Sequence, residues 1–256
     1  METKTIYRSA KGEIDRVRIA AKGSFKCDVR RGLELCKEMG IDYIELADET
    51  FLSACAETGV EGTVTEGKTV GAVVTLPMDV KDGYYEGSSL EKLRMQAFGV
   101  FMQGKVAITY NRLCPGAITK DGTPGPLFYL LKEINHRITK LGRTLMALAK
   151  VAPSKWKVLA DEELPFGCAV TEFKDSEGNR YLLVQNTDYE NKDKKAFCLK
   201  LQKQYRIYRV NPHTGQQILS KTTDADNVLV MPGDVDLLRF QDAEEDAYFL
   251  KYVLKK

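Results

Sequence analysis

The chain has 256 residues, 43% of them hydrophobic and 29% charged, a composition that excludes a disordered or fibrous protein. Lys and Arg total 38 and Asp and Glu total 36, so the formal charge of +2 gives no electrostatic indication of nucleic-acid or membrane binding. With only two histidines, His136 and His213, a three-histidine zinc site cannot be built. We therefore expect no metal, no cofactor, no nucleic-acid partner and no membrane partner.

The six cysteines form no CxxC pair and lie mostly in apolar stretches, which indicates buried thiols in a reducing compartment rather than a disulfide framework. The first 23 residues are charged throughout and lack the apolar core of a signal peptide. No run approaches the ~20 apolar residues of a membrane-spanning helix. The sequence as written predicts a cytoplasmic protein, or a secreted or periplasmic one if its true N-terminus is missing.

Up to about residue 150, short apolar runs alternate with helical patterns. Strands are predicted at residues 17–21, 41–46, 70–76 and 106–110, and helices at 28–39, 49–57, 88–103 and 127–148. Asp28 is the expected N-cap of the first helix, and Gly40 is expected just after its end. The alternation predicts a parallel sheet, either open or part of a (β/α) barrel. No glycine-rich phosphate-binding motif follows any strand, which disfavours the nucleotide-binding open sheets.

After residue 151 the helical periodicity ends and short strands alternate with turns. The strands are expected at residues 168–173, 180–186, 195–201, 204–210, 217–219, 227–231, 236–240 and 248–254. This spacing predicts a small antiparallel β-sandwich. We therefore expect two domains, 1–152 and 153–256, with the boundary near Pro153.

Several short motifs occur in an order that resembles a known family. They are LRMQAF at 93–98, ITY at 108–110, DGTPGPLFY at 121–129, YRVNPHTG at 208–215 and VMPGD at 230–234. Together they resemble the last helix and strand, the closing helix and the following β domain of barrel glycoside hydrolases of the β-galactosidase-like group. The resemblance covers roughly residues 90–240.

The resemblance implies a (β/α) barrel, and the length then becomes informative. A complete barrel of eight strands needs ~250 residues, whereas only about 150 residues and four βα units precede the β domain. If residues 106–110 match the eighth strand, the first four strands are absent. We therefore expect a partial barrel followed by the β-sandwich, and a homodimer or a second chain that completes the barrel.

Retaining glycosidases use two carboxyl groups ~5–5.5 Å apart, one to attack the anomeric carbon and one to protonate the leaving oxygen. The resemblance places the nucleophile after the seventh strand, where Asp79 is the nearest carboxylate. On this alignment the position of the acid/base is missing. Glu45 and Asp48 end an earlier strand and could face the mouth of a site, although Asp48 could equally be a helix N-cap.

Aromatic and amide side chains supply the expected sugar contacts. Tyr110 and Asn111 end the last strand of the first half, and Tyr84 and Tyr85 lie in a turn-rich segment that could stack on a sugar ring. Core packing or surface exposure is the competing interpretation of each. The sequence thus predicts a glycoside-hydrolase-related protein that binds carbohydrate and is catalytically incomplete as a single chain. The alternative is a non-catalytic carbohydrate-binding or protein-interaction module.

Overall fold

The computed structural model forms two compact units. It describes residues 8–9, 12–13, 17–22, 25–46, 51–64, 72–76, 80–81, 84–85, 90–156, 158–160, 164–191 and 195–243. One unit comprises Met1–Ser88 and Lys105–Met146, and the other comprises Ser89–Gly104 and Ala147–Lys256. The expected division near residue 152 therefore lies a few residues after the last change of unit.

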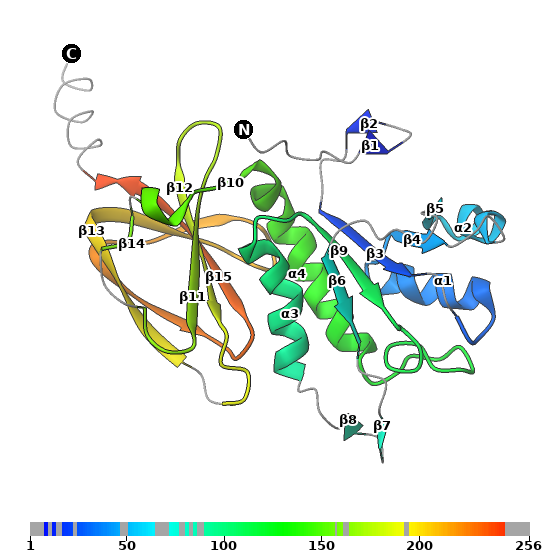
Figure 1. Cartoon of the computed structure of the whole chain (residues 1–256). Coiled ribbons are helices and arrows are strands. Elements are labelled where there is room, and N and C mark those ends of the chain that lie inside the picture. Colours follow the sequence, from blue (N-terminus) through cyan, green and yellow to red (C-terminus); the bar gives the residue numbers. More distant parts are fainter. Residues whose placement is uncertain are drawn as a thin grey trace. The chain divides into compact units, whose positions relative to one another are not determined.

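The first unit is built on a parallel sheet of five strands in the order β5-β4-β3-β9-β6 (Figure 1). Their bounds are Glu61–Val64, Tyr43–Leu46, Arg18–Lys22, Ala107–Asn111 and Ala72–Thr75, respectively. The parallel sheet is thus confirmed, with β5 as a strand that the sequence did not predict. Two small hairpins accompany it: β1 (Arg8–Ser9) with β2 (Gly12–Glu13), and β7 (Val80–Lys81) with β8 (Tyr84–Tyr85).

The order of the strands explains how this sheet differs from a consecutive barrel segment. The first strand, β3, lies between β4 and the last strand, β9. Strands that follow one another in the chain are paired in the sheet, except β5 and β6, which form its two edges. The first strand, β3, is also paired with the last, β9, as in a ring that is open between β5 and β6. Consecutive strands of a barrel are neighbours, so the only missing neighbour pair within the described sheet is β5 with β6. The described strands therefore form an open sheet, and a closed barrel is not shown.

The described residues of this unit form three helices: α1 (Val29–Glu38), α2 (Leu52–Thr58) and α4 (Phe128–Ala147). The Asp28 side chain accepts a hydrogen bond from the Arg31 amide at 3.0 Å, which confirms it as the N-cap of α1. Gly40 follows α1 at a φ of 76° and Gly59 ends α2 at 69°, left-handed conformations that glycine adopts without strain. The buried apolar side chains of α4 recur at spacings of three and four residues and form one stripe, which runs from Leu131 to Leu145.

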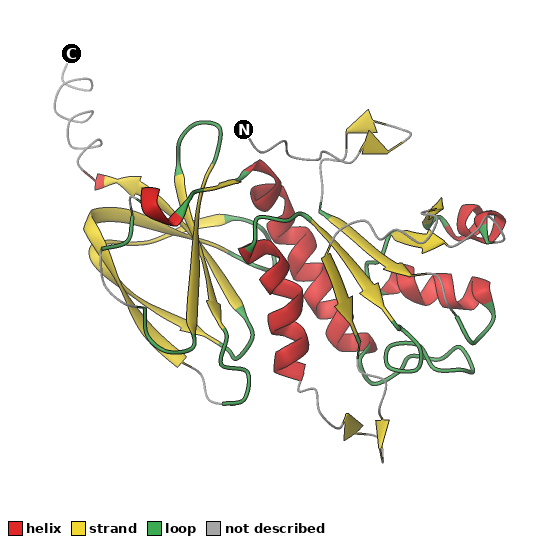
Figure 2. Cartoon of the chain, viewed as in Figure 1, coloured by secondary structure: helices red, strands yellow, loops and turns green. Residues whose placement is uncertain are grey.

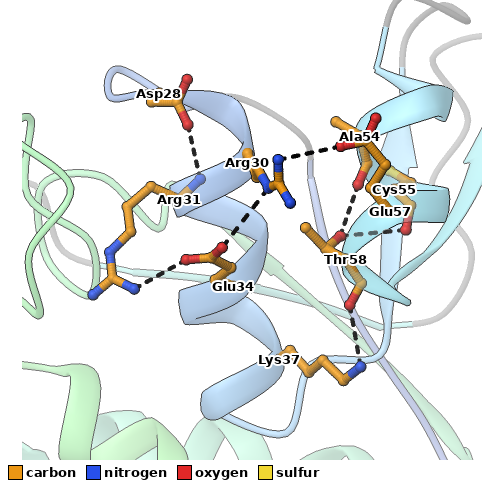
Figure 3. Close-up of polar contacts among 9 residues, drawn as sticks. All are labelled: Asp28, Arg30, Arg31, Glu34, Lys37, Ala54, Cys55, Glu57 and Thr58. Atoms are coloured by element: carbon orange, nitrogen blue, oxygen red, sulfur yellow. Dashed lines mark hydrogen bonds and ion pairs between the residues drawn. The ribbon is translucent and has the colours of Figure 1, made fainter.

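Exposed polar contacts join α1 to α2 (Figure 3). The Arg30 guanidinium lies 3.5 Å from the Glu57 carboxylate, and the Lys37 ammonium donates to the Thr58 carbonyl at 3.1 Å. Glu34 pairs with Arg31 at 3.2 Å on the same helix. Because these pairs are exposed to water, each contributes about 0–1 kcal/mol.

The described part of the second unit contains one antiparallel sheet in the order β10-β11-β12-β15-β13-β14. Figure 2 draws its strands in yellow. The bounds, in chain order, are Ala149–Lys150, Cys168–Lys174, Arg180–Asn186, Lys195–Val210, Gln217–Val230 and Val235–Asp242 for β10 to β15, and a 3₁₀ turn, Pro153–Lys155, follows β10. The antiparallel prediction is confirmed. The sandwich is not confirmed, because the six strands form one hydrogen-bonded sheet.

The long hairpin of β13 and β14 changes register between Lys200 and Tyr205. The sequence split each of these strands in two at this irregularity. Residues of β13 on both sides of this irregularity share one core with the rest of the sheet: Phe197 and Ile207 lie in the same buried cluster as Leu182 and Leu238. Both parts of β13 therefore contribute to the same core.

Helix α3 (Leu90–Met102) groups with this antiparallel sheet, although the sequence assigned it to the first half. The Gln185 amide of β12 donates to the Met95 carbonyl at 2.9 Å, and the Thr171 hydroxyl of β11 donates to the Met102 carbonyl at 3.0 Å. Side chains of the sheet thus bond the helix backbone in its middle and at its C-terminal end.

Candidate active site on the parallel sheet

Residues that are partners in register point to the same side of a sheet, so the register assigns each side chain to one of the two faces. One face of the parallel sheet is apolar and the other carries polar side chains. Tyr110 of β9 is fully buried, and its hydroxyl donates to the Asn135 amide oxygen of α4 at 2.8 Å. Asn135 in turn donates to the Met39 carbonyl after α1, also at 2.8 Å. Tyr110 therefore points to the helix-covered face and links β9, α4 and α1.

This placement does not fit the sugar-facing role expected for Tyr110. Its hydroxyl is bonded to Asn135 on the helix-covered face, away from the polar groups of the sheet, and burial raises the pKa of that hydroxyl well above the ordinary value. Successive side chains of a strand point to opposite faces, so the neighbours of Tyr110, Thr109 and Asn111, point to the other face. That opposite face carries the polar groups.

A buried polar cluster forms on this second face. The Arg18 guanidinium of β3 donates to Glu45 Oε1 of β4 at 3.0 Å, and the Thr109 hydroxyl of β9 donates to the same oxygen at 2.9 Å. The side chains of Arg18 and Glu45 are 6% and 1% exposed, so their attraction is little screened by water. Arg18 also lies 5.1 Å from the centre of the Tyr43 ring, a cation–π distance. Three adjacent strands therefore hold one carboxylate in place.

Polar residues also line the carboxyl ends of the strands on this face. Glu45 is the register partner of Thr63 on β5 and of Lys22 on β3, and Asn111 of β9 is the partner of Thr75 on β6. Four of the five strands contribute a member to this polar row, which consists of Glu45, Lys22, Asn111 and Thr75. Active sites of parallel α/β folds lie at the carboxyl ends of their strands, so the row is the candidate site.

The structure brings two predicted residues, Glu45 and Asn111, into this row. Asp48 and Asp79 lie outside the described residues. Tyr84 and Tyr85 form strand β8, paired with β7, and their side chains also lie outside the description. The roles expected for these four residues at the site therefore remain predictions.

The sequence reasoning missed Arg18, Lys22 and Thr109. In the segment Arg18-Ile19-Ala20-Ala21-Lys22, the two charges stand four residues apart, as they would on one face of a strand. That spacing was a usable signal for a second, polar face. Thr109 had no such signal, because a single threonine in a strand is ordinary β composition. Glu61, also missed, shares this face as the register partner of Tyr43 and is exposed.

Comparisons with known proteins give no family. No family model matches the chain, and no curated protein matches it significantly. Among the described residues, no helix has the length and apolar character of a membrane span, and no group of three or more His, Cys, Asp or Glu could hold a metal ion.

Solved structures of glycoside hydrolases match weakly. α-Galactosidase I from Mortierella vinacea matches at 10% identity and a TM-score of 0.37, over 61% of this chain and 37% of that one. The α-amylase from Anoxybacillus matches at 10% identity and 0.40, over 86% and 51%. A GH27 β-L-arabinopyranosidase from Geobacillus stearothermophilus matches at 10% identity and 0.36, over 84% and 61%. The chain spans less than two thirds of each of these proteins, and similarity at this level transfers neither residues nor activity.

Proposed function

We propose that the chain is glycoside-hydrolase-related and that its polar row is the carbohydrate site, with Glu45 as a catalytic carboxylate. The observation that carries the proposal is the placement of Glu45, which is buried near the carboxyl end of the parallel strand β4 and held by Arg18 and Thr109. A carboxylate fixed by two donors keeps one orientation, as a group acting on an anomeric carbon requires. The motifs between residues 90 and 240 that resemble barrel glycosidases support the same assignment.

Hydrolysis with retention needs a second carboxylate about 5–5.5 Å from the first. We propose Asp79, which follows β6 in the chain, as that group. The described alternative is Glu61, which lies on the same face one strand from Glu45. One carboxylate would attack the anomeric carbon while the other carboxyl group protonates the leaving oxygen. Water, deprotonated by that second group, would then hydrolyse the covalent intermediate and release the sugar.

The remaining predicted residues would bind the sugar. Asn111, in the polar row, offers an amide that can both donate to and accept from sugar hydroxyls. Asp48 would accept from a hydroxyl beside Glu45. Tyr84 and Tyr85 would stack on the apolar face of a sugar ring.

The open sheet supports the expectation that the site is incomplete in one chain. Its edges, β5 and β6, are the two strands that a closed ring would pair. An exposed parallel edge is a site for strand addition. We propose that a second copy or a second chain adds strands there and completes the wall around Glu45. We further propose a reducing, cytoplasmic location, because all six cysteines are free thiols.

Hydrolysis of a panel of nitrophenyl glycosides tests the enzyme proposal, with oligomeric state measured by light scattering on the same samples. Glu45→Asp keeps the charge and withdraws the carboxylate by one methylene, so it should lower kcat at least tenfold while leaving KM within twofold. Glu34→Gln, on the exposed surface of α1, is the matched control and should leave turnover unchanged. Asp79→Ala and Glu61→Gln decide between the two candidates for the second carboxylate. Wild-type turnover in the Glu45→Asp variant would refute the assignment.

The alternative function is a non-catalytic carbohydrate-binding or protein-interaction module. It is favoured by one detail of the cluster: Arg18 and Thr109 both bind the same oxygen of Glu45, an arrangement that a purely structural ion pair would also show. A non-catalytic module would bind glycosides without turnover, and Glu45→Asp would alter its stability but not its affinity.

A further inference from the structure

We infer that Lys22 and Arg112 form a cationic pair at the carboxyl ends of β3 and β9 that recognises the carboxylate of an acidic sugar. The inference rests on the proposed carbohydrate site and names its substrate class. It depends on where the two cations stand, on what surrounds them, and on the backbone conformation of Arg112.

The two cations end neighbouring strands. Ala21 of β3 is the register partner of Tyr110 of β9, so each strand continues by one residue to Lys22 and to Asn111. Arg112 is the next residue after Asn111, and it is exposed. In the sheet order β4-β3-β9-β6, the pair lies between the strand of Glu45 and the strand that leads to Asp79. A sugar bound over Glu45 would therefore have the two cations beside it.

Lys22 is the register partner of Glu45, but the ion pair of Glu45 is with Arg18. Lys22 is half-buried, and its register neighbour Glu45 presents Oε1 to Arg18 and Thr109 instead. Within the part of the chain that the structure describes, neither the Lys22 ammonium nor the Arg112 guanidinium has a hydrogen bond or an ion pair. A half-buried ammonium has lost part of its hydration, so an incoming carboxylate would restore a favourable contact.

The carboxylates described in the loops at this edge are occupied elsewhere. Asp28 caps α1 through the Arg31 amide, and Asp121 accepts a hydrogen bond from the Thr119 hydroxyl. The hydrogen bond from Thr119 holds the pKa of Asp121 below its ordinary value. Neither carboxylate is paired with Lys22 or Arg112.

The backbone of Arg112 gives the independent observation. Its φ of 62° is the only positive value at a non-glycine residue in the described chain. The left-handed region is unfavourable for a residue with a Cβ atom, and such strain persists mainly where a function requires the side chain. An arginine at a position better suited to glycine, immediately after a strand of the candidate site, fits a ligand-binding residue.

Binding of methyl glycosides to the full chain, followed by saturation-transfer NMR titration, tests the inference. Methyl β-D-glucuronide and methyl β-D-galacturonide are compared with the corresponding neutral glucoside and galactoside. The acidic glycosides should bind at least tenfold more tightly, because a charge-assisted hydrogen bond contributes a factor of about ten or more. Raising the salt concentration should reduce the difference in affinity between acidic and neutral glycosides, because salt screens the attraction between the cations and the carboxylate.

Three variants locate the effect. Lys22→Met and Arg112→Gly should each remove most of the preference for the acidic glycosides, measured as the ratio of acidic to neutral affinity in the same variant. Lys120→Met, an exposed lysine in the loop after Arg112, is the control and should leave this ratio unchanged. Arg112→Gly should also raise the midpoint of thermal unfolding, because glycine relieves the strained φ. A purely structural role for Arg112 predicts a lower midpoint instead.

The outcomes separate this inference from the proposed function. Equal affinity for acidic and neutral glycosides, or a preference that survives in Lys22→Met, overturns the inference and leaves hydrolysis of neutral substrates as a separate result. If the two cations serve only as counter-ions to catalytic carboxylates, their removal shifts the pH profile of turnover without changing discrimination. A Lys22-dependent preference without any turnover supports the inference and counts against the enzyme proposal.

Discussion

Gly233→Ala should destabilise the second unit far more than the same change at another left-handed glycine. Gly233 has a φ of 75°, and an added Cβ atom would lie 2.0 Å from the Glu91 carbonyl oxygen and 2.9 Å from the Met95 amide nitrogen. Both are backbone atoms of α3, so no side-chain rotation can relieve the clash. Gly178 has a φ of 87°, and no atom lies within 4 Å of its added Cβ. The two glycines thus share the conformational penalty and differ only in the clash.

The expected magnitudes follow from this comparison. Ala in the left-handed region costs about 1–2 kcal/mol, which is the whole effect expected for Gly178→Ala. Overpacking adds about 1–3 kcal/mol for Gly233→Ala. Urea unfolding followed by fluorescence reports the difference, because the single tryptophan, Trp156, packs against the core of this sheet. Equal loss in the two variants would show that the turn does not approach α3 as described.

Other perturbations test the first unit and the thiols. Arg18→Met should lower the free energy of unfolding by about 3–5 kcal/mol, because it leaves the buried Glu45 carboxylate without its ion-pair partner. Adding Glu45→Leu should recover most of that loss. Chemical denaturation in which the two single losses simply add in the double variant would contradict this. Iodoacetamide at pH 8 should modify the exposed Cys198 at least tenfold faster than Cys36, whose pKa is raised by complete burial, and peptide mass spectrometry measures both rates. Asp28→Ala should lower stability by about 1 kcal/mol through loss of the α1 cap, as read from thermal melting; no change would mean that the cap hydrogen bond is dispensable.

Local features of the fold were predictable because their causes are local. The apolar stripe of α4, the Asp28 cap and the glycine at position 40 each depend on residues within a few positions of one another. Strand β5 escaped prediction because its sequence, Glu-Gly-Thr-Val, has no apolar alternation. Its pairing with β4 supplies what its composition does not.

The candidate site was only half predictable, because strand order and register are non-local. Glu45 and Asn111 were recognisable as polar residues at strand ends, and both fall in the polar row. The orientation of Tyr110 was not recognisable, because a shift of one position exchanges the two faces of a strand. Arg18 reaches Glu45 only because β3 pairs with β4, a contact between residues 27 positions apart.

The grouping of α3 with the antiparallel sheet also affects the order of events during synthesis. Its main partner strand, β12, begins about 80 residues after α3 ends. At roughly 5–20 residues per second, the helix is made some 4–16 s before that strand exists. During this interval the hydrophobic side chains of α3, many of them buried in the folded chain, lack the antiparallel sheet with which the helix groups. A nascent chain paused between residues 102 and 180 should therefore recruit hydrophobic-binding chaperones more strongly than one paused after residue 186.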